Sequence, residues 1–118
     1  MGAERPPQLT TGQLFELLWN ALADVLGTAA AAALLRRSVY RASGRTERLR
    51  DVLITRNGVD FVYALPSHWS EPGDATLDEL RKLVRELRPI LVELTGPVVV
   101  RRLGQIAALR ERGIVEEM

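Results

Sequence analysis

The chain has 118 residues and a formal net charge of +1; 47 % of its residues are hydrophobic and 26 % are charged. This size and composition are typical of one folded domain and exclude a disordered chain. Cysteine is absent and His68 is the single histidine, which excludes disulfides, thiolate chemistry and a metal site built from several Cys or His of one chain. We therefore expect one domain over residues 10–113, a loose lead-in over 1–9, a tail over 114–118, and no cofactor.

The sequence predicts neither export nor a membrane span. The longest charge-free apolar stretch, residues 25–35, is well short of the roughly 20 residues that a helix needs to cross a bilayer. Residues 1–8 contain a glutamate, an arginine and two prolines, and they lack the apolar centre of a signal peptide. We expect a cytoplasmic protein.

The first predicted element is a long N-terminal helix. Thr10 and Gln13 have the spacing of a capping box, so the helix should begin directly after Thr10. Apolar residues then recur at spacings of three and four as far as about Ala42, and Gly44 suits the helix end. An unbroken helix of this extent would be roughly 48 Å long; Gly27 and Thr28 are the place where it could bend or restart, and the sequence does not decide whether it does.

Seven small residues, 27–33, lie inside this helix. Small side chains let another backbone come close, and two interpretations follow. The segment is either a tightly packed core helix or a symmetric helix–helix contact across a dimer axis. A helix that outreaches its own domain favours the dimer.

The strongest local pattern predicts a β-hairpin. Residues 49–56 and 59–65 flank Asn57 and Gly58, the pair most typical of a two-residue turn. Since a lone hairpin is marginal in water and no third strand is apparent, the hairpin should lie on a helix or pair with a second subunit. The register that this turn implies pairs Arg56 with Val59, Ile54 with Phe61 and Val52 with Tyr63 on an apolar face, and Leu53 with Val62 on a half-polar face.

A helix should follow the hairpin, because apolar residues recur at helical spacing over residues 77–94. Thr76 and Glu79 have the spacing of a second capping box at its start. Pro89 removes one backbone hydrogen bond and should kink or divide the helix. Glu93, one turn further on in an apolar stretch, is either buried or paired with an arginine such as Arg101 or Arg102.

A last helix is predicted over residues 97–112. Gly96 suits the end of the preceding helix, and Pro97 suits the first turn of the next. Gly113 should close this last helix. Three consecutive valines, residues 98–100, would also suit a strand, and that alternative stays open.

Charge is distributed unevenly along the chain. Residues 36–56 hold seven arginines and two acidic residues, a local balance of 7 − 2 = +5, whereas residues 71–93 hold six carboxylates. The two segments would attract each other or a partner. Arginine binds phosphate well, but the near-neutral chain carries no recognised nucleic-acid motif, which disfavours nucleic acid. The anion-binding alternative is assigned to Arg36, Arg37, Arg41 and Arg45.

His68 and Trp69 stand together in a proline-bounded loop, residues 66–72. A titratable ring beside a large aromatic on a loop indicates a small binding site; alternatively, Trp69 plugs the core and His68 is solvated. In a ligand-sensing alternative, a cavity between the alanine-rich helix and the hairpin has Trp19, Tyr63, His68 and Trp69 near its mouth.

We expect an α+β domain with one long or bent N-terminal helix, one β-hairpin and two C-terminal helices. The sequence contains no nucleophile elbow, phosphate loop, dinucleotide motif or zinc-protease motif, and we assign no catalytic residue. The preferred function is a non-enzymatic, adaptor-like regulatory module that binds another protein and itself, as a homodimer. The partner-binding residues that we assign are Gly27, Ala30, Ala31, Arg37, Leu53 and Val62.

Overall fold

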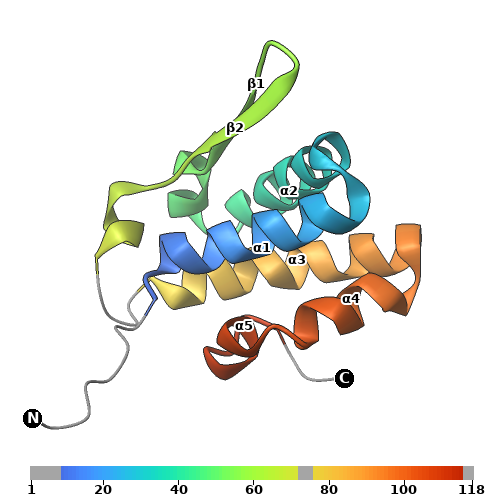
Figure 1. Ribbon diagram of the computed structural model, residues 1–118. Coiled ribbons are helices and arrows are strands. Elements are labelled where there is room, and N and C mark those ends of the chain that lie inside the picture. Colours follow the sequence, from blue (N-terminus) through green and yellow to red (C-terminus); the bar gives the residue numbers. More distant parts are fainter. Residues whose placement is uncertain (1–8, 72–75, 116–118) are drawn as a thin grey trace, which may run out of the picture.

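The computed structural model describes residues 9–71 and 76–115 and confirms the α+β fold class. Figure 1 shows three long helices side by side, a two-stranded hairpin on one side of them and two shorter helices on the other. The elements are α1 (Thr11–Leu26), α2 (Thr28–Ser43), η1 (Glu47–Asp51), β1 (Leu53–Asn57), β2 (Asp60–Ala64), η2 (Ser67–Ser70), α3 (Leu77–Thr95), α4 (Pro97–Gly104) and α5 (Ala107–Glu111), where η marks a 3₁₀ helix.

The predicted N-terminal helix is divided at Gly27 into α1 and α2, each of 16 residues. Gly27 has φ 88° and ψ 156°, a conformation that breaks the helix and that residues with a Cβ rarely adopt. After this break α2 turns back and packs against both α1 and α3 (Figure 1). The predicted capping box is present, with the Thr10 Oγ1 accepting from the Gln13 N–H at 3.2 Å and the Gln13 Oε1 accepting from the Thr10 N–H at 2.9 Å.

The alanine-rich segment serves the core of this same chain. Ala31 and Ala32 are fully buried, and α3 is the helix that α2 contacts most. Ala30 and Ala33 face solvent. Of the two expected forms, long or bent, the N-terminal segment takes the second, because the fold-back at Gly27 packs α2 against α1, and Ala31 has no exposed surface within this chain.

The hairpin forms, but its register differs from the predicted one. Its turn residues are Gly58 and Val59, with Asn57 opposite Asp60, so the pairs are shifted by two positions. Only Gly58 has a positive φ, 67°, whereas the predicted turn needs positive φ at both Asn57 and Gly58. The strand also begins later than expected, because residues 47–51 form η1. The observed pairs are Leu53 with Ala64, Ile54 with Tyr63, Thr55 with Val62, Arg56 with Phe61 and Asn57 with Asp60.

The predicted division of residues between the two hairpin faces is nevertheless correct. A shift of two positions leaves every side chain on its own face, because side chains alternate with a period of two. Ile54 is buried, and Phe61 and Tyr63 are partly buried against the helices. Leu53 and Val62 lie on the opposite, exposed face.

Helix α3 runs undivided through Pro89 for 19 residues, so the predicted division did not occur. Pro89 is exposed, as is Arg85, whose carbonyl loses its helical donor there. Glu93 is also exposed, which contradicts the buried alternative. The capping box at Thr76 and Glu79 is absent as well, since Thr76 makes no side-chain capping bond.

The last predicted helix is present in two parts. Pro97 begins α4, which places the three valines in a helix and not in a strand. Ile106 has an extended backbone, φ −80° and ψ 105°, and separates α4 from the short α5. Gly113, with φ 72°, closes α5 as expected, and Ile114 and Val115, assigned to the tail, are buried. The rest of the predicted tail and residues 1–8 of the lead-in lie outside the described residues.

Candidate functional site

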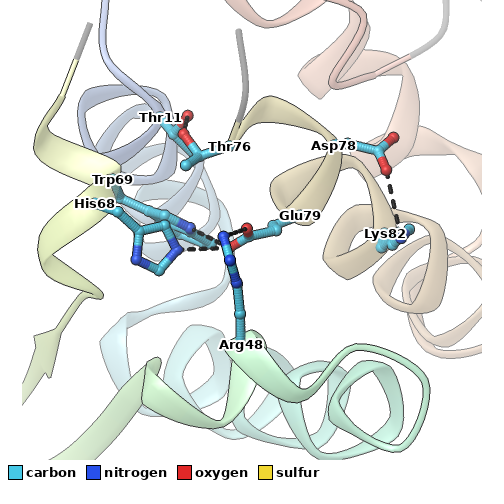
Figure 2. A network of polar contacts seen from close by, with 8 residues as sticks. All are labelled: Thr11, Arg48, His68, Trp69, Thr76, Asp78, Glu79 and Lys82. Carbon is cyan, nitrogen blue, oxygen red and sulfur yellow. Dashed lines mark hydrogen bonds and ion pairs between the residues drawn. The ribbon is translucent and has the colours of Figure 1, made fainter. Parts of the chain in front are cut away.

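A buried carboxylate, Glu79 in the first turn of α3, is the centre of the most connected polar cluster (Figure 2). It is 7 % exposed. Its Oε1 accepts a hydrogen bond of 2.9 Å from the Nε1 of Trp69 and lies 3.0 Å from the Nε2 of His68. Its Oε2 lies 3.7 Å from the Nη1 of Arg48 in η1. An ionised carboxylate only accepts, so with Glu79 ionised this contact is a hydrogen bond when Nε2 of His68 carries a proton.

This cluster explains why the predicted capping box is missing. The Glu79 side chain is directed at η2 and not at the backbone of Thr76. Thr76 instead joins its Oγ1 to the Oγ1 of Thr11 at 2.6 Å, inside the protein (Figure 2). The Thr76–Thr11 hydrogen bond holds the start of α3 on the start of α1, and the Glu79–Trp69 hydrogen bond holds it on η2.

Aromatic rings of α1, β2 and η2 lie together at the residues that were assigned to the mouth of a ligand cavity. Trp69 is fully buried and lies with its ring centroid 6.1 Å from that of Phe15. Tyr63 of β2 lies 4.9 Å from both Phe15 and Trp19, again between ring centroids. The structure thus brings together all four residues of the ligand-sensing alternative. Trp19 and Tyr63 contact each other, Trp69 lies near Phe15, and His68 contacts the carboxylate of Glu79 that also binds Trp69.

Burial raises the pKa of the Tyr63 hydroxyl above its usual value, and the negative charge of Glu16 adds to the rise. The protonated form of this side chain is therefore favoured in the folded state.

The arginine-rich segment divides into an exposed part and a part that meets the acidic segment. Arg45 pairs with Glu86 at 3.9 Å, and Arg48 with Glu79, so some of the predicted attraction between the two segments occurs within the chain. Arg36, Arg37 and Arg41 are exposed on α2. These three do not converge on the Glu79 cluster.

Five of the six residues assigned to partner binding are exposed, on two separate surfaces, and the sixth, Ala31, is buried. Gly27, Ala30 and Arg37 are exposed along α2. Leu53 and Val62 are 55 % and 43 % exposed on the hairpin side that faces away from the helices. With their neighbours Thr55 and Ala64 they form what we call the outer hairpin face.

Among the hollows formed by the described residues, two lie away from this cluster. The larger, about 140 Å³, is enclosed by α3, α4 and residues 113–115, and we call it the α3–α4 hollow. The smaller, about 110 Å³, lies between the end of α2 and α3. Sequence reasoning missed the first, although Arg81, Arg85 and Arg88 have the spacing of one helix face and all line it.

Within residues 9–71 and 76–115, no group of three His, Asp or Glu side chains is placed to hold a metal ion. No helix of the described residues is long and apolar enough to span a membrane. Comparisons of the chain with protein-family models, with curated proteins and with solved structures returned no match.

Proposed function

We propose that this chain is a non-enzymatic, cytoplasmic interaction module that associates with a second copy of itself through the outer hairpin face. The observation that supports the proposal is the exposure of Leu53 and Val62 on a sheet that has only two strands in the described part of the chain. The inner face of the hairpin already packs on the helices through Ile54 and Tyr63. Its outer face is therefore the side that a partner can cover.

The physical argument comes from the marginal stability of two-stranded sheets. Such a sheet needs cover on an apolar face or a further strand to be stable in water. Two copies stacked across a two-fold axis would bring Leu53 and Val62 of one copy against the same residues of the other. The unpaired edges of β1 and β2 offer further backbone hydrogen bonds to a neighbour.

The association should be weak, because the face is small. A stable interface buries about 800 Å² on each partner, and four short side chains supply only a fraction of that area. We expect a dissociation constant on the order of 10–100 μM for the pair.

The proposal assigns no reaction to His68 and Glu79. Their carboxylate–imidazole contact shares its acceptor with the buried Trp69, which gives the pair a part in the fold. We therefore treat the cluster as the support that holds η2 on α3.

The test is sedimentation velocity of Val62→Lys beside a matched control, Val92→Lys. Val92, on α3, is 41 % exposed, which matches the 43 % of Val62, and lies away from the hairpin. The wild type and Val92→Lys should dimerise with rising concentration, and Val62→Lys should stay monomeric. A wild type that stays monomeric at concentrations above the expected dissociation constant of about 10–100 μM would contradict the proposal, as would equal effects of the two variants.

A second candidate function, binding of nucleic acid or another polyphosphate, is favoured by one observation. Tyr40 is 82 % exposed on α2 among Arg36, Arg37 and Arg41, and α2 contains no acidic residue. An exposed ring among arginines can stack on a base while the guanidinium groups bind phosphates.

Salt-dependent retardation of RNA or DNA tests this candidate. Replacing Arg36, Arg37 and Arg41 by Gln should abolish retardation, whereas replacing the exposed Arg101, Arg102 and Arg110 should leave it unchanged. Equal losses in both triple variants would mean that only net charge matters, and no retardation by the wild type would dismiss the candidate.

A further inference from the structure

The α3–α4 hollow has an apolar wall. Aliphatic side chains of all three enclosing segments line it, among them Leu87 of α3, Val100 of α4 and Ile114. Its volume is about 140 Å³, and it is partly open to solvent. An apolar cavity of about 150 Å³ in another protein is large enough to take up benzene, so the space here suits a phenyl ring or a short branched alkyl group.

One side of the hollow is cationic. Arg81, Arg85 and Arg88 follow one another at spacings of four and three on α3, which puts them on one face of the helix. No Asp or Glu lines the hollow among the described residues. The site therefore combines an apolar wall with a positively charged rim.

Two of these arginines are suited to hold an anion. The Nη2 of Arg81 donates a 2.8 Å hydrogen bond to the carbonyl of Arg112, and its guanidinium lies against Gly113, so its position is set by the chain. Arg85, one turn further on, is exposed and forms no ion pair with any described carboxylate. A fixed guanidinium beside an available one is a good receptor for a carboxylate, which takes paired N–H donors.

We propose that the α3–α4 hollow binds a small carboxylate with an apolar body, of the size of an arylacetate or a short branched fatty acid. The ring or alkyl group covers the aliphatic wall, and the carboxylate lies at Arg81 and Arg85. Inorganic phosphate would use the rim alone, and a neutral aromatic would use the wall alone. Both should bind more weakly than the molecule that uses both.

The test is isothermal titration of the full-length chain with sodium phenylacetate, benzyl alcohol and inorganic phosphate. Phenylacetate should bind at one site with a dissociation constant of about 1 mM or tighter, as expected for a ligand of its size. Arg85→Gln should weaken this binding about tenfold, the loss expected for one charge-assisted contact. Arg36→Gln, the same charge change on the exposed surface of α2, should leave it unchanged.

A second variant tests the apolar part. Val84, which lines the hollow, is replaced by Leu, which adds one methylene to the wall and should weaken phenylacetate binding while the thermal midpoint stays close to that of the wild type. The proposal is overturned by any of three results: no saturable binding of phenylacetate, equal affinity for phosphate or benzyl alcohol, or equal affinities of the Arg85→Gln and Arg36→Gln variants.

Discussion

Replacing Glu79 by Ala should destabilise the fold more than replacing the neighbouring carboxylate Asp78. Glu79 accepts a hydrogen bond from the indole N–H of Trp69, and its carboxylate also contacts the ring of His68. The Glu79→Ala change leaves the indole N–H inside the protein without an acceptor. Asp78 is half-exposed and pairs with Lys82 at 3.4 Å on the helix surface.

The magnitude follows from the burial of each partner. A buried donor that loses its acceptor costs about 1–3 kcal/mol, and the fully buried Trp69 should fall in the upper part of that range. His68 is 28 % exposed, so water replaces part of its lost contact, and the well-exposed Arg48 contributes under about 1 kcal/mol. The sum is about 2–5 kcal/mol, a large share of the roughly 5–15 kcal/mol that stabilises a typical domain.

Urea denaturation followed by tryptophan fluorescence measures this difference, since both reporters, Trp19 and Trp69, are buried in the folded chain. Glu79→Gln is the intermediate case, because one amide oxygen can still accept from both donors, and it should lose about 1–2 kcal/mol. Asp78→Ala should lose less than about 1 kcal/mol. Equal losses for Glu79→Ala and Asp78→Ala would refute the argument that the cluster holds η2 on α3.

Three further predictions concern other parts of the fold. Because the pKa of Tyr63 is raised, the stability it contributes should be complete below about pH 10 and be lost as the pH rises through that raised pKa. In a Tyr40→Phe background the phenolate absorbance should appear at higher pH than in free tyrosine amide, and coincident titrations would contradict the prediction. Gly27→Ala should lower the free energy of unfolding by about 1–3 kcal/mol, because φ is 88° at this position. Gly44→Ala, at φ −65°, should leave the free energy of unfolding unchanged or raise it. Equal effects of the two variants in a denaturation experiment would contradict the prediction. Thr11→Val and Thr76→Val should show a coupling of about 1 kcal/mol in a double-mutant cycle, and strictly additive losses would argue against their hydrogen bond.

Local patterns predicted those elements whose stabilising contacts lie close in sequence. The box at Thr10 and Gln13 forms because both side chains are at the surface and have no competing partner inside the protein. The same spacing at Thr76 and Glu79 failed because Trp69, distant in the sequence, offers Glu79 a buried N–H. The choice between these outcomes depends on tertiary packing, which the spacing does not contain.

The hairpin shows the same limit. Alternation predicted which of its side chains face the helices, and that prediction holds because it survives a shift of two positions. The register itself depends on whether Asn57 adopts a positive φ, and Asn57 and Gly58 allow more than one turn.

The α3–α4 hollow lay beyond sequence reasoning. The spacing of Arg81, Arg85 and Arg88 is visible in the chain, but the apolar wall opposite them is made by α4 and residues 113–115. The position of that wall depends on the end of α4 at Gly104 and on the turn at Gly113.

The measurement that tests the proposed self-association most directly is a dilution series of the wild-type chain followed by backbone amide NMR. Dilution from about 500 to about 10 μM spans the expected dissociation constant. The amides of Leu53, Thr55, Val62 and Ala64 should shift together, while those of the equally apolar and exposed Val92 and Val98 stay fixed. Amide positions that do not change with concentration, or changes confined to α3 and α4, would contradict the account.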